Sequence, residues 1–416
     1  MSKLTSFNTT NQPFLTHLSV SKTAHVIITA ETPDFDDSVL SAWRAEGFAV
    51  QYIPLGSDGP AAYTRRLHAA ADAATGLNDT WSLVAFGDAA AACLESHHRK
   101  SVPRLVALIA YYPSSLPDPA RTTYPPGLSV LVHLPAHSTV SVVRTPEILG
   151  IQGKRRKTVS KRVDGGVVGI GGRIVNLAVP TYTYPGVEAG WAERDLDEFD
   201  DVAERLAWSR SLGTVRRASG CVGAELDLEA ARDMHHKGKK TRDGNDDDDG
   251  EAGSAEATLL CLPTLVGGST PHHQLQEFYA KNFSPSPEEL GARLLSRTIG
   301  VDRVVDELSL GFTHDRNVDW LLPRVPLTNK RVQVVIVVVV AVRGGRMCSE
   351  RVYWDQAGVL VQLGLLDPAL VSGGMKESGV KRLPVVSGRE GVRAVVGGGQ
   401  DMPDLNRLML RDNDRE

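Results

Sequence analysis

Residues 332–342 constrain the fold of this chain more than any other segment. Ten of these eleven side chains are apolar, and most are β-branched, which favours an extended strand over a helix. The run is about half as long as a membrane-spanning helix, so it predicts a strand buried on both faces. Gly344 and Gly345 predict a tight turn, after which residues 347–366 form the second strand of a hairpin.

Composition places the chain among globular proteins with two domains. A length of 416 residues exceeds one ordinary hydrophobic core, and 42% hydrophobic with 23% charged residues is typical of folded domains. The formal net charge of -4 gives no general attraction to nucleic acid or to anionic membranes. We therefore expect neither as a partner.

Cysteine usage and the N-terminus bear on compartment and cofactors. The four cysteines are scattered without a CxxC or a short Cys/His spacing, so the sequence predicts no disulfide framework, no metal site and no cofactor. Residues 1–12 are polar and lack the apolar core of a secretory signal. A cytoplasmic protein is the expectation.

The N-terminal half alternates between strand and helix patterns. This alternation favours an α/β domain in which helices cover the faces of a parallel sheet. An acidic helix is predicted over residues 195–210, with its apolar residues at helical spacing. The strand candidates are the apolar segments 24–30, 48–54, 82–86, 106–111 and 128–134.

Composition shifts divide the chain into four parts. Residues 1–230 form the first domain, in which 138–172 is predicted to be an irregular excursion with a basic and a Gly-rich part. Residues 231–268 are predicted to be a charged flexible linker, because residues 232–258 hold almost nothing apolar to bury. Residues 269–372 form the second domain, and 373–416 a C-terminal extension.

Five blocks of the second domain begin at Arg297, Val304, Phe312, Asp319 and Tyr353, and cover residues 297–300, 304–307, 312–314, 319–323 and 353–356 with 362–366. In this order the blocks resemble the SnoaL-like family of the nuclear-transport-factor-like superfold. The resemblance implies an α+β cone around one ligand-sized pocket, and relatives that include polyketide cyclases and isomerases.

The resemblance and the residue chemistry together indicate candidate site residues. Proton transfer in an apolar pocket needs a titratable group, and Asp355, His314 and Asp306 are the candidates. An alternative is that Asp355 forms a structural ion pair with Arg297 or Arg351. The expected substrate-binding residues are Trp320, Tyr353, Trp354 and Arg297, although large aromatic residues fill cores more often than they line sites.

Residues 85–90 of the first domain read Ala-Phe-Gly-Asp-Ala-Ala, and residues 184–191 read Tyr-Pro-Gly-Val-Glu-Ala-Gly-Trp. With these motifs the domain resembles, more faintly, the dienelactone hydrolase (carboxymethylenebutenolidase) branch of the α/β-hydrolase fold. Gly87 stands where that family has its nucleophile, and Ala189 where it has its histidine. No carboxylate follows the strand that ends at Leu134, where the family's acid belongs. Because the triad acts as a unit, these losses predict a pseudoenzyme.

Three functions stay open at this level. The first is a cone that binds a small hydrophobic or planar molecule, with cyclase or isomerase activity through an Asp or His. The second is a non-catalytic ligand-binding or dimerisation module that forms a homodimer through the C-terminal sheet. The third is ester or lactone hydrolysis by the first domain through a displaced triad.

Overall fold

The structure is a computed structural model, in which the chain divides into two compact units, Met1–Ala224 and Glu225–Glu416. Each unit is described by itself. No helix in the described part of the chain combines the length and apolar character that crossing a bilayer requires. The described residues are 24–76, 79–98, 101–117, 123–136, 139–144, 157–162, 179–220, 256–287, 289–378 and 380–397.

Unit 1 is built on a six-stranded sheet in the order β2-β1-β3-β4-β6-β9. Every neighbouring pair in it is parallel, which confirms the predicted parallel sheet. The central strands are almost completely buried, as strands covered on both faces must be. The strands are β1 (Ala24–Thr29), β2 (Ala49–Tyr52), β3 (Thr80–Phe86), β4 (Leu105–Tyr111), β6 (Ser129–Pro135) and β9 (Thr181–Tyr184).

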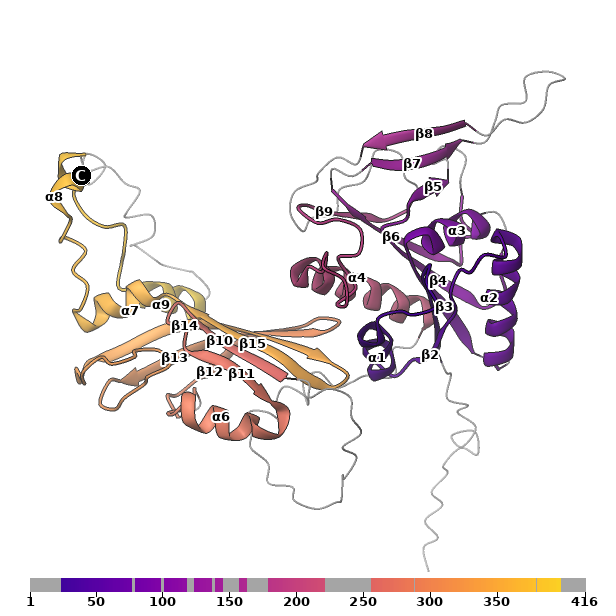
Figure 1. The fold of residues 1–416 in the computed structure, drawn as a ribbon. Helices are drawn as coiled ribbons and strands as arrows, with labels where there is room; N and C mark the ends of the chain where they lie inside the picture. The colour runs from indigo at the N-terminus through magenta and orange to yellow at the C-terminus, as the bar shows by residue number, and fades with distance from the viewer. Residues whose placement is uncertain are drawn as a thin grey trace, which may run out of the picture. The chain divides into compact units, whose positions relative to one another are not determined.

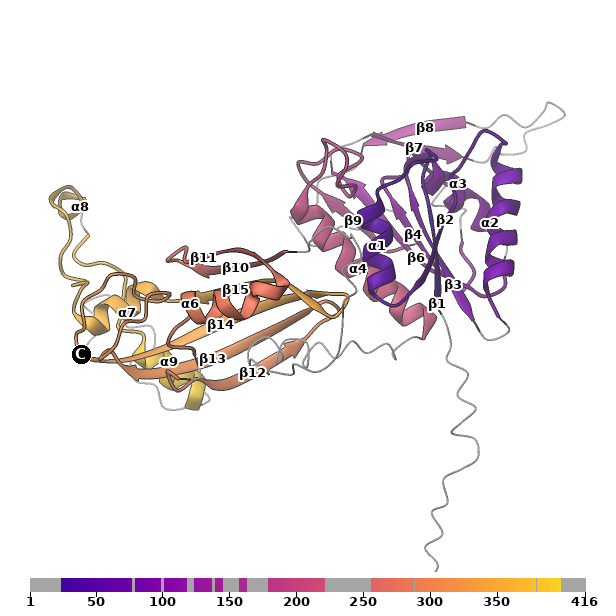
Figure 2. The same ribbon diagram turned by 60° about the horizontal axis from the view of Figure 1, so that its bottom comes forward.

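Helices cover both faces of this sheet (Figures 1 and 2). Helices α1 and α4 share one face, where the rings of Trp43 and Trp208 lie 5.0 Å apart. Helices α2 and α3 cover the other face, and the α/β class therefore holds for this unit. The helices are α1 (Asp37–Ala45), α2 (Pro60–Ala74), α3 (Gly87–His97) and α4 (Asp201–Ser219).

Helix α4 begins and ends later than the predicted 195–210. The Asp200 side chain accepts a first-turn backbone N–H at 2.7 Å and caps the helix, so the acidic segment before it stays outside. Leu196 and Val202, expected on the apolar face, are 40% and 58% exposed. The helix continues to Gly220, whose left-handed conformation ends it.

Part of the predicted irregular excursion at 138–172 is regular. A small second sheet joins β5, β7 and β8, with β7 and β8 antiparallel. The basic run therefore ends in a strand, while the Gly-rich stretch 165–172 lies outside the described residues. The strands are β5 (Ser115–Pro117), β7 (Thr139–Arg144) and β8 (Lys157–Arg162).

Unit 2 is α+β, with a six-stranded sheet in the order β11-β10-β15-β14-β13-β12. Only the β10–β15 pair is parallel. The strands are β10 (Glu256–Leu262), β11 (Gly267–Pro271), β12 (Arg293–Ile299), β13 (Arg303–Thr313), β14 (Arg331–Arg343) and β15 (Arg346–Trp354). The helices are a 3-10 turn (His272–Gln274), α6 (Leu275–Asn282), α7 (Gln356–Leu363), α8 (Gly373–Glu377) and α9 (Arg389–Gly397).

The predicted linker 231–268 extends too far toward the C-terminus. Strand β10 lies within it, because Ala257, Leu259 and Cys261 alternate with less buried residues and point into the core. The part of the predicted linker before residue 256 lies outside the described residues.

Strand β14 buries one face completely and the other only in part. Its burial alternates strictly along 331–343, with Val338 3% exposed and Val337 in the half-buried set. The prediction of burial on both faces was wrong, because the apolar composition of the run hides a period of two. The buried face carries the core of unit 2, against which Phe278 and Tyr279 of α6 also pack.

The predicted second strand, 347–366, is a strand followed by a helix. Strand β15 ends at Trp354, opposite Ile336, and α7 begins two residues later. Beyond the end of β15, the Gln362 side chain of α7 makes the hydrogen bonds to β14 that a neighbouring strand would make. Its amide donates to the Gln333 carbonyl at 2.8 Å and accepts the Gln333 N–H at 2.9 Å.

The two faces of β14 predict different costs of truncation. We expect Val338→Ala to lower the free energy of unfolding of unit 2 by about 2 kcal/mol, because it removes buried methyl groups and leaves a cavity. Val337→Ala, a matched change on the half-buried face, should cost about half as much or less. Urea denaturation of both variants measures the difference, and equal costs would contradict the assigned register.

Candidate functional site

Two buried carboxylates lie on the core face of the unit 2 sheet. Asp306 is 1% exposed and Glu350 is 2% exposed. Asp306 pairs in register with Val338 and Glu350 with Val340, so the two flank β14 on an otherwise apolar face. Burying an ionised carboxylate is costly unless a partner compensates, so each position requires one.

Arg297 is the partner of Asp306. The two residues face each other across β12 and β13, with Nε–Oδ1 at 2.7 Å and Nη2–Oδ2 at 3.0 Å. Two parallel charge-assisted hydrogen bonds fix both the position and the plane of the guanidinium. The Arg297 side chain keeps 13% exposure, whereas that of Asp306 keeps 1%. The alternative that Arg297 pairs with Asp355 is therefore wrong.

Tyr279 of α6 is the partner of Glu350. Its hydroxyl donates to the Glu350 carboxylate and also contacts Met347 Sδ at 3.6 Å. Burial, and then the charge of Glu350, raise the pKa of the Cys261 thiol. Sequence reasoning missed this carboxylate, although Glu350 shares the parity of the inward-facing Val352 and could have been found from it.

Asp355 does not point into the core. It is exposed and caps α7, accepting the Gly358 N–H at 2.9 Å. The expected pocket position was wrong because the chain leaves the sheet there, and a short carboxylate at a helix N-terminus serves as a cap. The preceding Tyr353 is 38% exposed, and the indole N–H of Trp354 donates to Gln356 at 2.7 Å.

His314 is fully buried at the end of β13. Its Nδ1 lies 3.1 Å from Thr328 Oγ1, and its backbone pairs with Asn329 and Lys330. Burial lowers the pKa of His314, so the imidazole is neutral near pH 7. Within the described residues, no hydrogen bond or ion pair joins His314 to Asp355.

Trp320 belongs to the packed interior rather than to an open wall. It is fully buried, stacks on Phe283 at 5.5 Å and meets Trp354 edge-on at 5.8 Å. Its indole N–H donates to the Pro285 carbonyl at 3.1 Å. With its ring contacts and its polar atom satisfied, Trp320 contributes packing, which is the alternative that the sequence left open.

In unit 1 the expected nucleophile position lies at a sharp strand-to-helix turn. Gly87 follows β3, opens α3 and has φ +53°, a left-handed conformation that glycine accepts at little cost. The Glu31 carboxylate occupies the space beside it, where an added Cβ would meet Oε1 at 1.9 Å. Glu31 also accepts the N–H of Asp88. Ala189, the expected histidine position, is exposed and carries only a methyl group.

The carboxyl group of Glu193 interacts electrostatically with Glu31, the residue beside this turn. Burial raises its pKa to about 7; the hydrogen bond donated by Tyr112 opposes the rise, and the charges of Asp195 and Glu31 add to it. A carboxyl group with a pKa near neutrality can both give and take a proton. Glu31 and Asp88 follow β1 and β3, and ligands of open parallel sheets bind beyond such strand ends.

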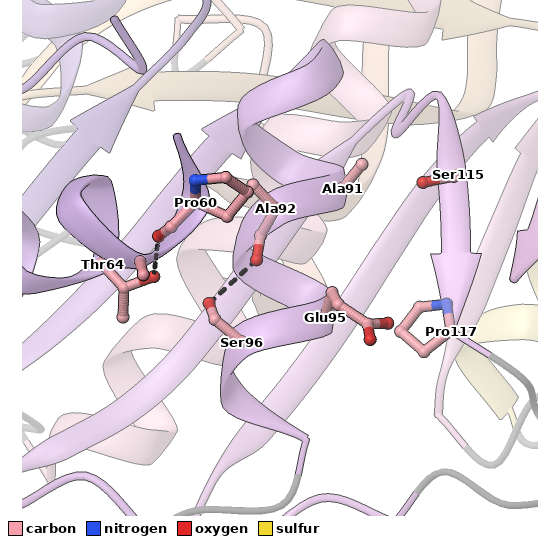
Figure 3. A pocket seen from close by; sticks show the side chains of 9 residues that line it. Pro60, Thr64, Ala91, Ala92, Glu95, Ser96, Ser115 and Pro117 are labelled. Atoms are coloured by element: carbon pink, nitrogen blue, oxygen red, sulfur yellow. Dashed lines mark hydrogen bonds between the residues drawn. The ribbon is translucent and has the colours of Figure 1, made fainter. Parts of the chain in front are cut away.

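A surface hollow of about 390 Å³ lies between α2, α3 and β5 (Figure 3). The volume is within the range of small-molecule sites. Its walls are mostly alanine and proline, and the hydroxyls of Thr64 and Ser96 bond to backbone carbonyls of their own helices. The lining residues are Pro60, Ala61, Thr64, Ala91, Ala92, Glu95, Ser96, Ser115 and Pro117.

No family model and no curated protein matches the chain. Similar solved structures include AclR from Streptomyces galilaeus, described as a candidate hydroxylase (20% identity, 29% of this chain and 74% of that chain, TM-score 0.20). A protein described as a candidate SnoaL-like polyketide cyclase from Jannaschia sp. CCS1 matches at 18% identity (27% and 73%, TM-score 0.21). One described as a candidate polyketide cyclase from Acidithiobacillus ferrooxidans matches at 16% identity (38% and 94%, TM-score 0.22).

The raised pKa of Glu193 predicts a pH dependence of unit 1. An unfolded glutamate titrates near 4.5, so between about pH 4.5 and 7 the folded chain binds more protons than the unfolded chain. The contribution of Glu193 to the free energy of unfolding should therefore fall as the pH rises through this window, in opposition to the buried His97 and His133, whose lowered pKa values make their contribution rise. The free energy of unfolding of Glu193→Gln relative to wild type should therefore increase with pH, whereas Glu188→Gln, at an exposed position, should keep the wild-type profile. Thermal melting at a series of pH values measures the effect, and parallel profiles for wild type and Glu193→Gln would refute it.

Proposed function

We propose that unit 2 binds a small hydrophobic or planar molecule at the β12 edge of its sheet, beside Arg297. One observation carries the proposal. A bidentate ion pair with a carboxylate at 1% exposure stands on a face that is mostly apolar. Such a pair contributes little net stability relative to well-packed apolar side chains, so a binding role accounts for it better than a structural one.

The two polar pairs have separate tasks in this proposal. Asp306 holds the guanidinium of Arg297 in one plane, and that group binds an acceptor oxygen of the ligand. Proton transfer of the cyclase or isomerase kind uses Tyr279 and Glu350. This pair takes the acid/base role that the sequence analysis gave to Asp355, because Asp355 caps a helix at the surface. The apolar surroundings supply the affinity for a flat hydrocarbon framework.

The planar dye anilinonaphthalene sulfonate is a suitable probe, because it joins fused rings to an anionic oxygen group. We expect the full chain to bind it, and Arg297→Gln combined with Asp306→Asn to weaken the affinity about tenfold by removing a charge-assisted contact. The double change keeps an amide pair and avoids leaving an unpaired buried carboxylate. Fluorescence titration measures the affinity.

Arg293→Gln is the matched control, since Arg293 lies on the same strand but is exposed and pairs with Ser309 of the half-buried face. It should bind the dye like the wild type. Unchanged affinity in the double variant, with folding verified by circular dichroism, would rule out the role of Arg297.

A second candidate function concerns unit 1, which we propose to be a hydrolase-like scaffold without triad hydrolysis. The turn at Gly87 has the strand-to-helix geometry on which such enzymes expose a nucleophile. Here the position has no side chain, and the Glu31 carboxylate fills the space beside it. The arrangement leaves no hydroxyl or thiol at the turn to attack an ester.

A fluorophosphonate probe tests this second proposal, because it labels activated serine nucleophiles covalently. We expect no labelling of the full chain at concentrations that label a serine esterase completely. Labelling that is lost on heat denaturation, and that mass spectrometry maps to a serine of unit 1, would revive hydrolysis through a displaced triad.

A further inference from the structure

Two histidines on neighbouring helices of unit 1 lie in direct contact outside the sites described above. The Nε2 atoms of His68 on α2 and His97 on α3 are 3.0 Å apart, with the rings inclined at 67°. His97 is fully buried and His68 is half-buried. Their separation in sequence is 29 residues, so only the packing of α2 on α3 brings them together.

Hydrogen bonds fix the tautomer of each ring. His97 Nδ1 lies 2.8 Å from the Cys93 carbonyl, which can only accept, so this nitrogen carries the proton. The Nε2 of His97 is then a lone pair, and His68 donates its Nε2–H to it. Burial lowers the pKa of both rings, that of His97 to about 4, and both are therefore neutral at pH 7.

We propose that His68 and His97 form an open binding site for a borderline divalent transition metal such as Zn²⁺, which replaces the proton between the two Nε2 atoms. Neutral imidazole is a preferred ligand for this class of ion. The bond from His97 Nδ1 to a backbone carbonyl is the arrangement that orients metal-binding histidines.

The geometry is close to what a tetrahedral ion requires. Zn–N bonds of 2.0–2.1 Å at the tetrahedral angle place two ligand nitrogens about 3.3–3.4 Å apart. The observed 3.0 Å needs an opening of only a few tenths of an ångström. During binding the proton of His68 moves from Nε2 to Nδ1, so each ring keeps one proton and stays neutral.

The remaining coordination positions belong to water or to an added ligand. Among the described residues, no group of three or more His, Cys, Asp or Glu side chains is placed to hold a metal. The hollow of Figure 3 lies on the same pair of helices. Its lining residue Thr64 precedes His68 by one helical turn on the same face, and Ser96 Oγ lies 3.0 Å from His97 Nδ1.

Calorimetric titration of the full chain with ZnCl₂ tests the proposal. Because the chain has twelve histidines, the site is assigned by difference. We expect a binding event in the wild type that His68→Ala and His97→Ala each weaken at least about tenfold. His98→Ala is the matched control, since His98 is the next residue and bonds through Nδ1 to the Glu95 carbonyl. It should keep the event.

Thermal melting supplies a second measurement, which does not depend on counting the zinc ions bound at other histidines. Zn²⁺ should raise the melting temperature of unit 1 in the wild type and in His98→Ala, but not in His68→Ala. Replacement of the fully buried His97 can prevent folding. His68 is only half-buried, so His68→Ala tests the site while His97 stays in place. Equal zinc affinity and equal stabilisation in wild type and His68→Ala would overturn the proposal, and so would the absence of any zinc binding by the wild type.

Discussion

The alternation of β14 between a sealed face and a half-open face is the constraint on which unit 2 depends. Its even-numbered side chains form the middle of the core, and the strands on either side must place their own inward residues against them. Asp306 and Glu350 are inward residues by this register alone. Their carboxylates have no access to bulk water, so the fold must provide Arg297 and Tyr279 as partners.

These partners come from different levels of structure. Arg297 faces Asp306 across a regular antiparallel ladder, so the pairing follows from strand register. Tyr279 reaches Glu350 from a helix 71 residues earlier in the chain, so that contact exists only once α6 packs on the sheet. A site assembled in this way couples its chemistry to the packing of the whole unit.

Periodicity and turn chemistry made much of the fold predictable. The parallel sheet of unit 1 and the hairpin turn at Gly344 both carry local signals. Two boundaries were predicted wrongly at places where a single side chain determines whether a helix begins. Asp200 begins α4 after the acidic segment, and Asp355 turns the chain out of the sheet into α7. In both cases a carboxylate that the sequence analysis placed inside a predicted element caps the helix that follows it.

The candidate sites were less predictable than the fold. The block resemblance led to Arg297 and Asp306, which the structure does bring together, but nothing local marks Glu31, Glu193 or the contact of His68 with His97. Each of these depends on segments that are distant in sequence and meet through topology. Such contacts leave no pattern along a single chain that periodicity can detect.

The amide of Gln362 has a consequence for the solubility of unit 2. Where β15 stops, the first residues of β14 would otherwise present open backbone groups beside a row of valines, which is a template for a strand from another molecule. A single side chain saturates the Gln333 N–H and carbonyl from a helix, and a helix cannot pass the pairing on to a further strand. The guanidinium of Arg389 closes the next position by donating to the Arg331 carbonyl. The segment after β15 thus protects this edge of β14 against aggregation through the side chains of Gln362 and Arg389, without a seventh strand.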